Sequence, residues 1–163
     1  MGSALAMVAG TAACYNYGEP EVVIRDMSLD ATWRTVNANL HELVPDWDAN
    51  RPFPEHPLDW PATLVGCEIG DDSRLTGPPW SVSVETELID LEQSELADID
   101  RGLDALAAQG YVSGKVGSSE STEDRHVENG EGFSVHLRAD EQSGTYQVVS
   151  VSPCIRFDGD DKY

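Results

Sequence analysis

The histidines, serines and acidic residues of this chain do not form a recognisable catalytic or metal-binding pattern. The four histidines are His41, His56, His126 and His136, and no two of them have the spacing of metal ligands. A catalytic triad needs a base beside its nucleophile and an acid that orients the base. Serines and acids are so abundant here that their presence alone identifies nothing. We therefore expect no catalytic residue, no metal and no cofactor.

Two acidic segments have some features of calcium sites. Residues 46–50 imitate the first positions of an EF-hand loop, but Arg51 replaces its turn glycine and Pro57 stands where a bidentate Glu is needed. The acidic tail 158–163 is expected to be flexible and solvated, with weak calcium binding as the alternative. A pair of carboxylates of the glycosidase type is defined by the distance between its two carboxyl groups, which the sequence does not give.

Cys14 is the first reactive side chain, and it directly follows a short apolar run. Residues 4–13 are apolar or small, too few to span a bilayer but suited to the core of a signal peptide. The sequence Thr-Ala-Ala-Cys over 11–14 is similar to a lipobox, although no Lys or Arg precedes the apolar run. We expect a leader over residues 1–14 with lipidation at Cys14. The alternative is a buried N-terminal helix with a free cysteine.

Cys67 and Cys154 remain if a lipid occupies Cys14. An odd number of cysteines is awkward for a secreted protein, whereas two residual thiols can pair in an oxidising compartment. A bond between them would close a long loop and stabilise the fold by roughly 4–5 kcal/mol in the chain-entropy model. The alternative is a pair of unbonded, buried thiols in a cytoplasmic protein.

A loop rich in proline and aromatic residues follows the first expected helix. Five prolines between 45 and 61 exclude regular structure there, and the aromatic residues are Trp47, Phe53 and Trp60. These side chains either pack the loop against the core or form a surface that binds a ligand or partner, because exposed aromatics are frequent in binding hot spots. They are the candidate binding surface.

The charge of the chain excludes some partners. The 163 residues carry a net charge of -20, without any basic patch. Binding to nucleic acid requires clustered Lys and Arg that neutralise phosphates, so we expect no nucleic-acid partner. Attraction to anionic lipid headgroups fails for the same reason, so membrane association has to come from a covalent or apolar anchor.

The periodicity of apolar residues predicts two main helices among several strands. Apolar residues recur at helical spacing after Asp30, a plausible cap, and again between Ser94 and Gln109. Strands are expected over 63–69, 80–88, 111–116, 133–137 and 146–155, with a short one possible at 22–24, a break at 77–79 and an exposed loop over 117–132. The prediction is an α+β fold: an antiparallel sheet of four to five strands with two helices packed on one face.

This arrangement gives a simple domain organisation. The leader at 1–14 is followed by a tether over 15–28, a single α+β domain over 29–157 and the tail 158–163. About 130 residues are enough to bury one core.

Several short motifs together resemble a known family. They are Cys14, Trp33 with Val36, Gly66-Cys67, Trp80, Leu106 with Gly110-Tyr111, and Ser152-Pro153-Cys154. In this order they resemble the small cell-envelope lipoproteins of actinobacteria, of which the LppA-like lipoproteins of mycobacteria are examples. That family is largely of unknown function. The resemblance implies a lipid-anchored domain on the outer face of the cytoplasmic membrane and a Cys67–Cys154 disulfide.

The expected function is therefore non-enzymatic: an anchored envelope protein that binds a protein partner or an envelope component. The alternative is a small-molecule or lipid carrier with an apolar cavity between sheet and helices. A hydrolase is the least favoured class.

Overall fold

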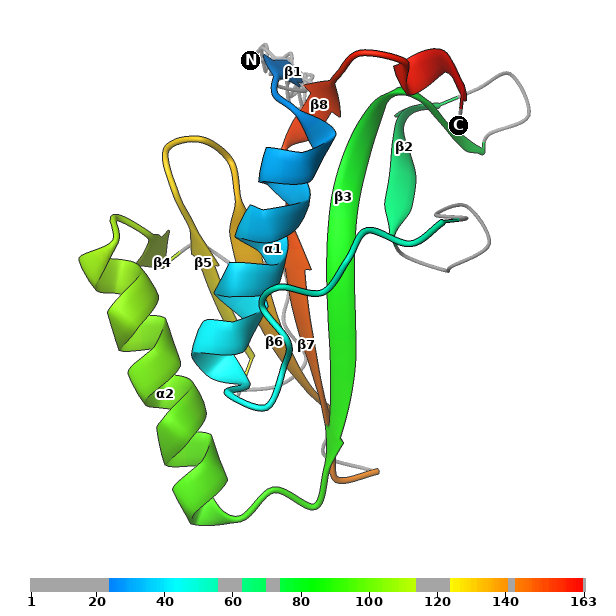
Figure 1. Ribbon diagram of the computed structural model, residues 1–163. Coiled ribbons are helices and arrows are strands. Elements are labelled where there is room, and N and C mark those ends of the chain that lie inside the picture. Colours follow the sequence, from blue (N-terminus) through cyan, green and yellow to red (C-terminus); the bar gives the residue numbers. More distant parts are fainter. Residues whose placement is uncertain (1–23, 56–62, 70–73, 114–123, 141–142, 163) are drawn as a thin grey trace, which may run out of the picture.

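The computed structural model of the protein describes residues 24–55, 63–69, 74–113, 124–140 and 143–162 (Figure 1). Its helices are α1 (Leu29–Leu43) and α2 (Gln93–Ala108), with a 3-10 turn η1 at Asp160–Lys162. Its strands are β1 (Ile24–Asp26), β2 (Leu64–Ile69), β3 (Leu75–Ile89), β4 (Val112–Ser113), β5 (Arg125–Glu128), β6 (Ser134–Asp140), β7 (Thr145–Val151) and β8 (Cys154–Arg156).

The strands form one mixed sheet with the order β1-β8-β3-β7-β6-β5-β4, and β2 pairs with β3 outside this path. The long strand β3 joins two regions: its first half lies against β2 and β8, and its second half against β7. Only β1 and β8 run parallel, and the other pairs in the described residues are antiparallel. Figure 1 shows both helices in front of the same side of this curled sheet.

The α+β class with two helices on one face of the sheet is confirmed, but the sheet has eight strands in place of the expected four to five (Figure 1). Its pairs are antiparallel as expected, except that β1 pairs with β8 in parallel. Two described strands go beyond those expected: β5, whose four residues give little apolar alternation, and β8, which is only three residues long. The strand expected over 146–155 is divided at Ser152-Pro153 into β7 and β8. The break expected at 77–79 lies inside β3, and β5 occupies part of the loop expected over 117–132.

Each helix begins one or two residues before its expected cap. Ser28 caps α1, and its hydroxyl accepts a hydrogen bond from the Ala31 amide. Glu92 caps α2 in a capping box with Glu95, in place of the expected Ser94. The expected stop of α2 at Gly110 is confirmed, because this glycine has φ of 95° and only glycine adopts that region freely.

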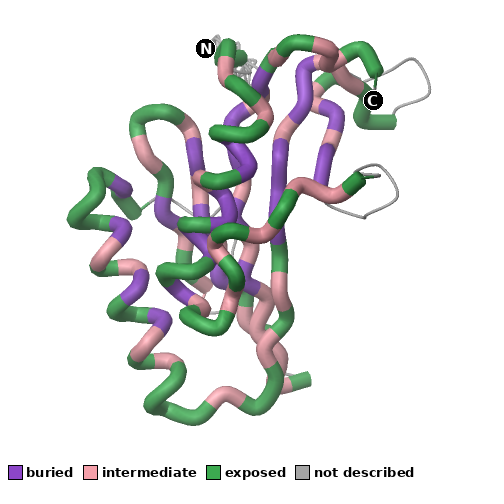
Figure 2. Tube along the Cα trace, in the orientation of Figure 1, coloured by how far each residue is buried: buried purple, intermediate pink, exposed green. Residues whose placement is uncertain are grey.

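The core lies between the helices and the inner face of the sheet (Figure 2). Fully buried side chains from α1, α2 and the central strands meet there: Val36, Leu40, Leu43, Leu106, Phe133, Val135 and Val148. Two buried asparagines of α1 also take part. Asn39 donates to the Tyr111 hydroxyl at 2.8 Å, and burial raises the pKa of that phenol.

The two helices are in close contact at Gly102 of α2. A Cβ atom at this position would lie 2.2 Å from the Glu42 carbonyl oxygen of α1. The absence of a side chain at Gly102 therefore allows the two backbones to touch. Among the described residues, no helix is both long enough and apolar enough to cross a lipid bilayer.

The two segments that flank the expected domain make ordered contacts where they are described. The end of the expected tether forms β1, which pairs with β8. In the tail, the Asp160 carbonyl accepts a hydrogen bond of 2.9 Å from the Trp80 indole nitrogen of β3. The leader, including Cys14, lies outside the described residues.

Candidate functional site

Cys67 and Cys154 form a disulfide between β2 and β8. These strands lie on opposite sides of β3, so the bond crosses over that strand. The register between β2 and β3 shifts at Gly66 and Glu68, beside the bonded cysteine. The Cα atoms are 6.1 Å apart, within the usual range for a disulfide. The covalent link thus joins residues that are 87 positions apart in sequence.

The aromatic loop expected to bind a partner lies against α1, with two of its three aromatics described. The Trp47 indole nitrogen donates to the buried Asn37 side chain at 2.9 Å. The His41 ring nitrogen lies 2.8 Å from the Trp47 carbonyl oxygen. The Arg51 guanidinium lies over the Trp47 ring at 5.1 Å. Trp47 is partly buried against the core, so much of its surface serves to hold the loop in place.

Phe53 lies further along the same loop and packs edge-on against Trp33 of α1, with ring centroids 5.1 Å apart. The Trp33 indole nitrogen donates to the Arg51 carbonyl oxygen at 2.6 Å. A shallow hollow of about 430 Å³ opens beside them, lined also by Asp30, Arg34 and Asn50. Trp60, the third member of the expected surface, lies outside the described residues. The structure therefore brings Trp47 and Phe53 onto one helix, mainly as packing residues.

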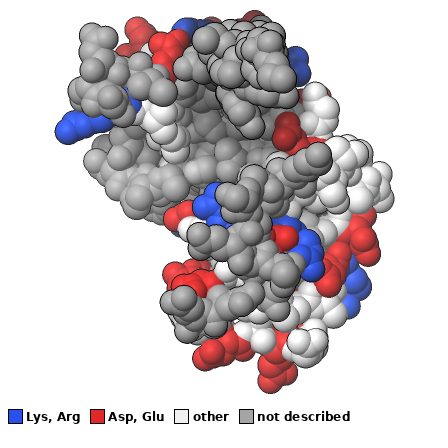
Figure 3. All heavy atoms as spheres, turned by 180° about the vertical axis from the view of Figure 1, so that it is seen from behind, with Lys and Arg blue, Asp and Glu red and all other residues white. Residues whose placement is uncertain are grey.

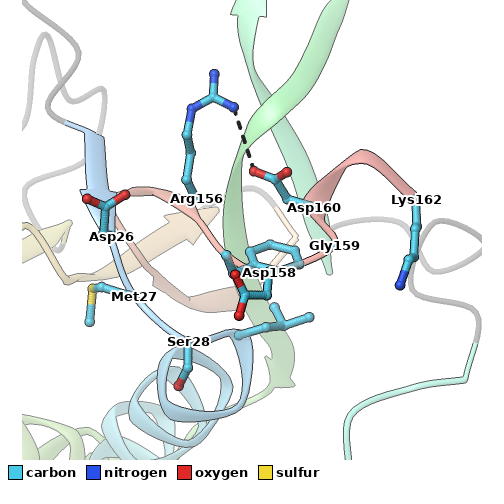
Figure 4. A pocket seen from close by; sticks show the side chains of 10 residues that line it. Asp26, Met27, Ser28, Arg156, Asp158, Gly159, Asp160 and Lys162 are labelled. Carbon is cyan, nitrogen blue, oxygen red and sulfur yellow. Dashed lines mark ion pairs between the residues drawn. The ribbon is translucent and has the colours of Figure 1, made fainter.

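A second hollow lies where α1 begins, beside the segment that follows β8 (Figure 4). It has a volume of about 760 Å³, and charged side chains of both signs line it: Asp26, Arg156, Asp158, Asp160 and Lys162. Arg156 and Asp160 form an ion pair at 3.7 Å across one side of it. Three carboxylates and two cationic groups line this hollow, so charges of both signs are mixed along it.

The nearest approach to a catalytic arrangement is on the outer face of the sheet, which is turned away from the helices. The Ser134 hydroxyl lies 3.2 Å from Nε2 of His136, and the His136 ring stacks on His126 of β5 with centroids 4.2 Å apart. Partial burial, helped by the neighbouring His126 and Arg138, lowers the pKa of His136 to about 4. The imidazole is therefore neutral at pH 7 and a weak base.

This serine–histidine contact is incomplete as a hydrolytic site. In the described residues, no carboxylate bonds to His136 to orient it, as a triad requires. The described residues also contain no group of three or more His, Cys, Asp or Glu side chains able to hold a metal ion. The expected outward direction of His136 agrees with its place on the outer face, opposite His126 in the β5–β6 register.

Sequence reasoning missed the pairing of His126 with His136. The two histidines are each five residues from Glu131, the centre of a tight turn in which the Asn129 side chain accepts hydrogen bonds from the amides of Glu131 and Phe133. Gly132 has φ of 93°, which fits the last position of a three-residue hairpin loop over 130–132, and a hairpin centred on Glu131 places the two histidines opposite each other. Comparison of the chain with protein-family models, curated proteins and solved structures found no match in any of the three.

Proposed function

We propose that this protein is a non-enzymatic domain of the cell envelope, anchored by a lipid on Cys14, that binds a protein partner outside the cytoplasm. The observation that carries the proposal is the Cys67–Cys154 disulfide. Structural disulfides persist in oxidising compartments and are rare where the cytosol keeps thiols reduced. With these two sulfurs bonded to each other, Cys14 is the one cysteine left for a lipid.

The binding role is supported by how the interior is filled. Large side chains occupy the space between sheet and helices, where a carrier would need a cavity for its ligand. The hollows described above instead open at the surface and have charged linings. These features favour a surface that contacts another macromolecule over a carrier, the alternative function.

The test is to produce the full chain with its own N-terminus in an actinobacterial host and measure its intact mass with and without reductant. Cleavage before Cys14, an added acyl mass and a gain of two hydrogens on reduction are the expected results. A Cys14→Ser variant is the matched control: it should lose the acyl mass and the membrane fraction, while it keeps the disulfide. A full-length, unacylated protein with three free thiols would overturn the proposal.

A further inference from the structure

Among the described residues, the second half of β3 has a partner strand on one side only. Its register with β7 runs from Ser83 opposite Val151 to Ile89 opposite Thr145. On its other side, the pairing with β2 ends at Val82, followed by one hydrogen bond from the Ser83 amide to the Thr63 carbonyl. Beyond this point, no described strand lies beside Glu85–Ile89 (Figure 1).

Three residues of this edge direct their backbone groups away from β7. The Ser152 amide donates to the Val82 carbonyl, and the Asp90 amide donates to the Gly144 carbonyl. Both bonds continue the β3–β7 ladder, so the even-numbered residues of β3 are the ones that hydrogen-bond with β7. Backbone direction alternates along an antiparallel strand, so the odd-numbered residues face the open side. Glu85, Glu87 and Ile89 thus offer their amides and carbonyls to another strand.

The side chains along this edge differ between the two faces of the sheet. Glu85 and Glu87 are exposed on the outer face, and Ile89 is 64% exposed beside them. Glu85 accepts a hydrogen bond of 3.1 Å from Gln147, whereas Glu87 has no hydrogen bond or ion pair in the described structure. Thr86 and Leu88 lie half-buried on the inner face. Figure 3 shows the outer face, with acidic side chains gathered at its lower rim.

We propose that the Glu85–Ile89 edge of β3 binds an extended, cationic segment of a partner protein by strand addition. Strand addition uses backbone hydrogen bonds for affinity and alternate side chains for specificity. The segment would carry Lys or Arg at alternate positions on the outer face, beside Glu85 and Glu87. Between them it would carry small apolar or β-branched residues, next to Thr86 and Leu88.

A second copy of the chain fits this edge poorly. An antiparallel copy centred on Glu87 would place two Glu87 carboxylates side by side, and like charges directly opposite each other destabilise a strand pair. Each copy also carries a net charge of -20. Charged side chains commonly protect sheet edges from pairing with a second copy, and Glu85 and Glu87 would act in this way. The same carboxylates are complementary to a strand that carries basic side chains.

The test uses the purified, oxidised full chain and a capped seven-residue peptide of alternating Lys and Val. Titration at low and at physiological salt should show saturable binding that weakens with salt. A peptide with alternating Glu and Val is the charge control. Two further Lys-Val peptides are N-methylated. One carries the methyl groups on its odd-numbered amides, which face one side of the extended peptide, and the other carries them on its even-numbered amides, which face the opposite side. Only one of these two should lose binding, because only one edge pairs with β3.

Variants of β3 complete the design. Glu87→Lys should weaken binding of the Lys-Val peptide by about fivefold or more, since it turns an exposed attraction into a repulsion. Glu87→Pro removes an outward amide and leaves the even-numbered ladder with β7, so it should abolish binding. Glu128→Lys, on the outer face but away from this edge, is the matched control and should bind normally.

The outcomes separate the possibilities. Equal binding of both N-methylated peptides would show simple charge attraction and overturn strand addition. Absence of saturable binding, or concentration-dependent self-association that Glu87→Pro abolishes, would overturn the cationic partner. The inference rests on the proposed function, because it names the kind of partner that the domain binds. If the protein is found unacylated but binds the peptide, the peptide-binding edge is supported and only the lipid anchor is overturned. If the protein is acylated but does not bind the peptide, the anchor is supported and the peptide-binding edge is overturned.

Discussion

The two halves of β3 belong to one strand but are held in different ways. The half from Leu75 to Val82 lies between two short strands, β2 and β8, which a disulfide joins across it. The half from Ser83 to Ile89 has one partner strand among the described residues, and its inner face meets the helix-covered core. A covalent bond thus secures the region where strands are short, and packing secures the region where helices cover the sheet. The second region can leave an edge free.

The largest expected effect comes from removing the covalent link. The double variant Cys67→Ser with Cys154→Ser should lose roughly 4–5 kcal/mol of unfolding free energy, the chain-entropy value for a loop of this length. Urea denaturation followed by circular dichroism measures it. Reduced wild-type protein is the control and should match the variant. A loss below about 1 kcal/mol would mean that packing alone holds both halves of β3.

A side chain at Gly102 should damage the other region. Gly102→Ala places a methyl group against the Glu42 carbonyl, so the helices must separate. The overpacking exceeds the gain in helix propensity, and we expect a net loss of about 2 kcal/mol in the same urea experiment. Asp104→Ala, exposed on the same helix, is the control and should be neutral or slightly stabilising. Equal behaviour of the two variants would contradict the close helix contact.

Acid should lower the stability of the protein through His136, which lies on the outer face of the helix-covered half. The folded-state pKa of His136 is lowered to about 4 by burial, His126 and Arg138, whereas an unfolded histidine titrates near 6.5. Between these values the unfolded chain binds more protons, so stability falls as pH drops from about 6.5 to 4. After discounting for solvent screening, His136 contributes about 1–2 kcal/mol to this fall.

The measurement is the urea midpoint between pH 7 and pH 4, compared between wild type and His136→Gln. The variant should have a shallower decline through this range, because it cannot gain the proton. If His136→Gln and the wild type decline in parallel, the stacked histidines do not couple protonation to folding.

The sequence predicted the elements with strong periodicity and missed those set by long-range contacts. Both helices and the inward positions Val82, Val84, Val135 and Leu137 follow from apolar spacing alone. By contrast, β5 lies in a charged segment with little apolar alternation, and β8 is too short to be separated from β7 by pattern. The parallel pairing of β1 with β8 joins strands that are distant in sequence. The free edge of β3 was equally hidden, because alternation shows which face a residue occupies but not which strand lies beside it.

Two buried serines give the finest comparison of the two regions. Ser152, near the disulfide, is satisfied: its hydroxyl accepts from the Val82 amide and donates to the Pro153 carbonyl. Ser150, opposite Val84 and Val135 in the helix-covered half, is fully buried and its hydroxyl has no hydrogen-bond partner in the structure. An unsatisfied buried hydroxyl destabilises a fold by about 1–3 kcal/mol.

Replacing each serine by alanine should therefore have opposite effects. Ser150→Ala removes the unsatisfied group and should stabilise the protein by about 1 kcal/mol, whereas Ser152→Ala leaves the Val82 amide unpaired and should destabilise it by about 1–2 kcal/mol. Both variants delete the same atom from a buried site, so the difference between their urea midpoints reports hydrogen bonding and little else. A loss of stability in both would mean that Ser150 has a partner, and that polar contacts also hold the helix-covered half.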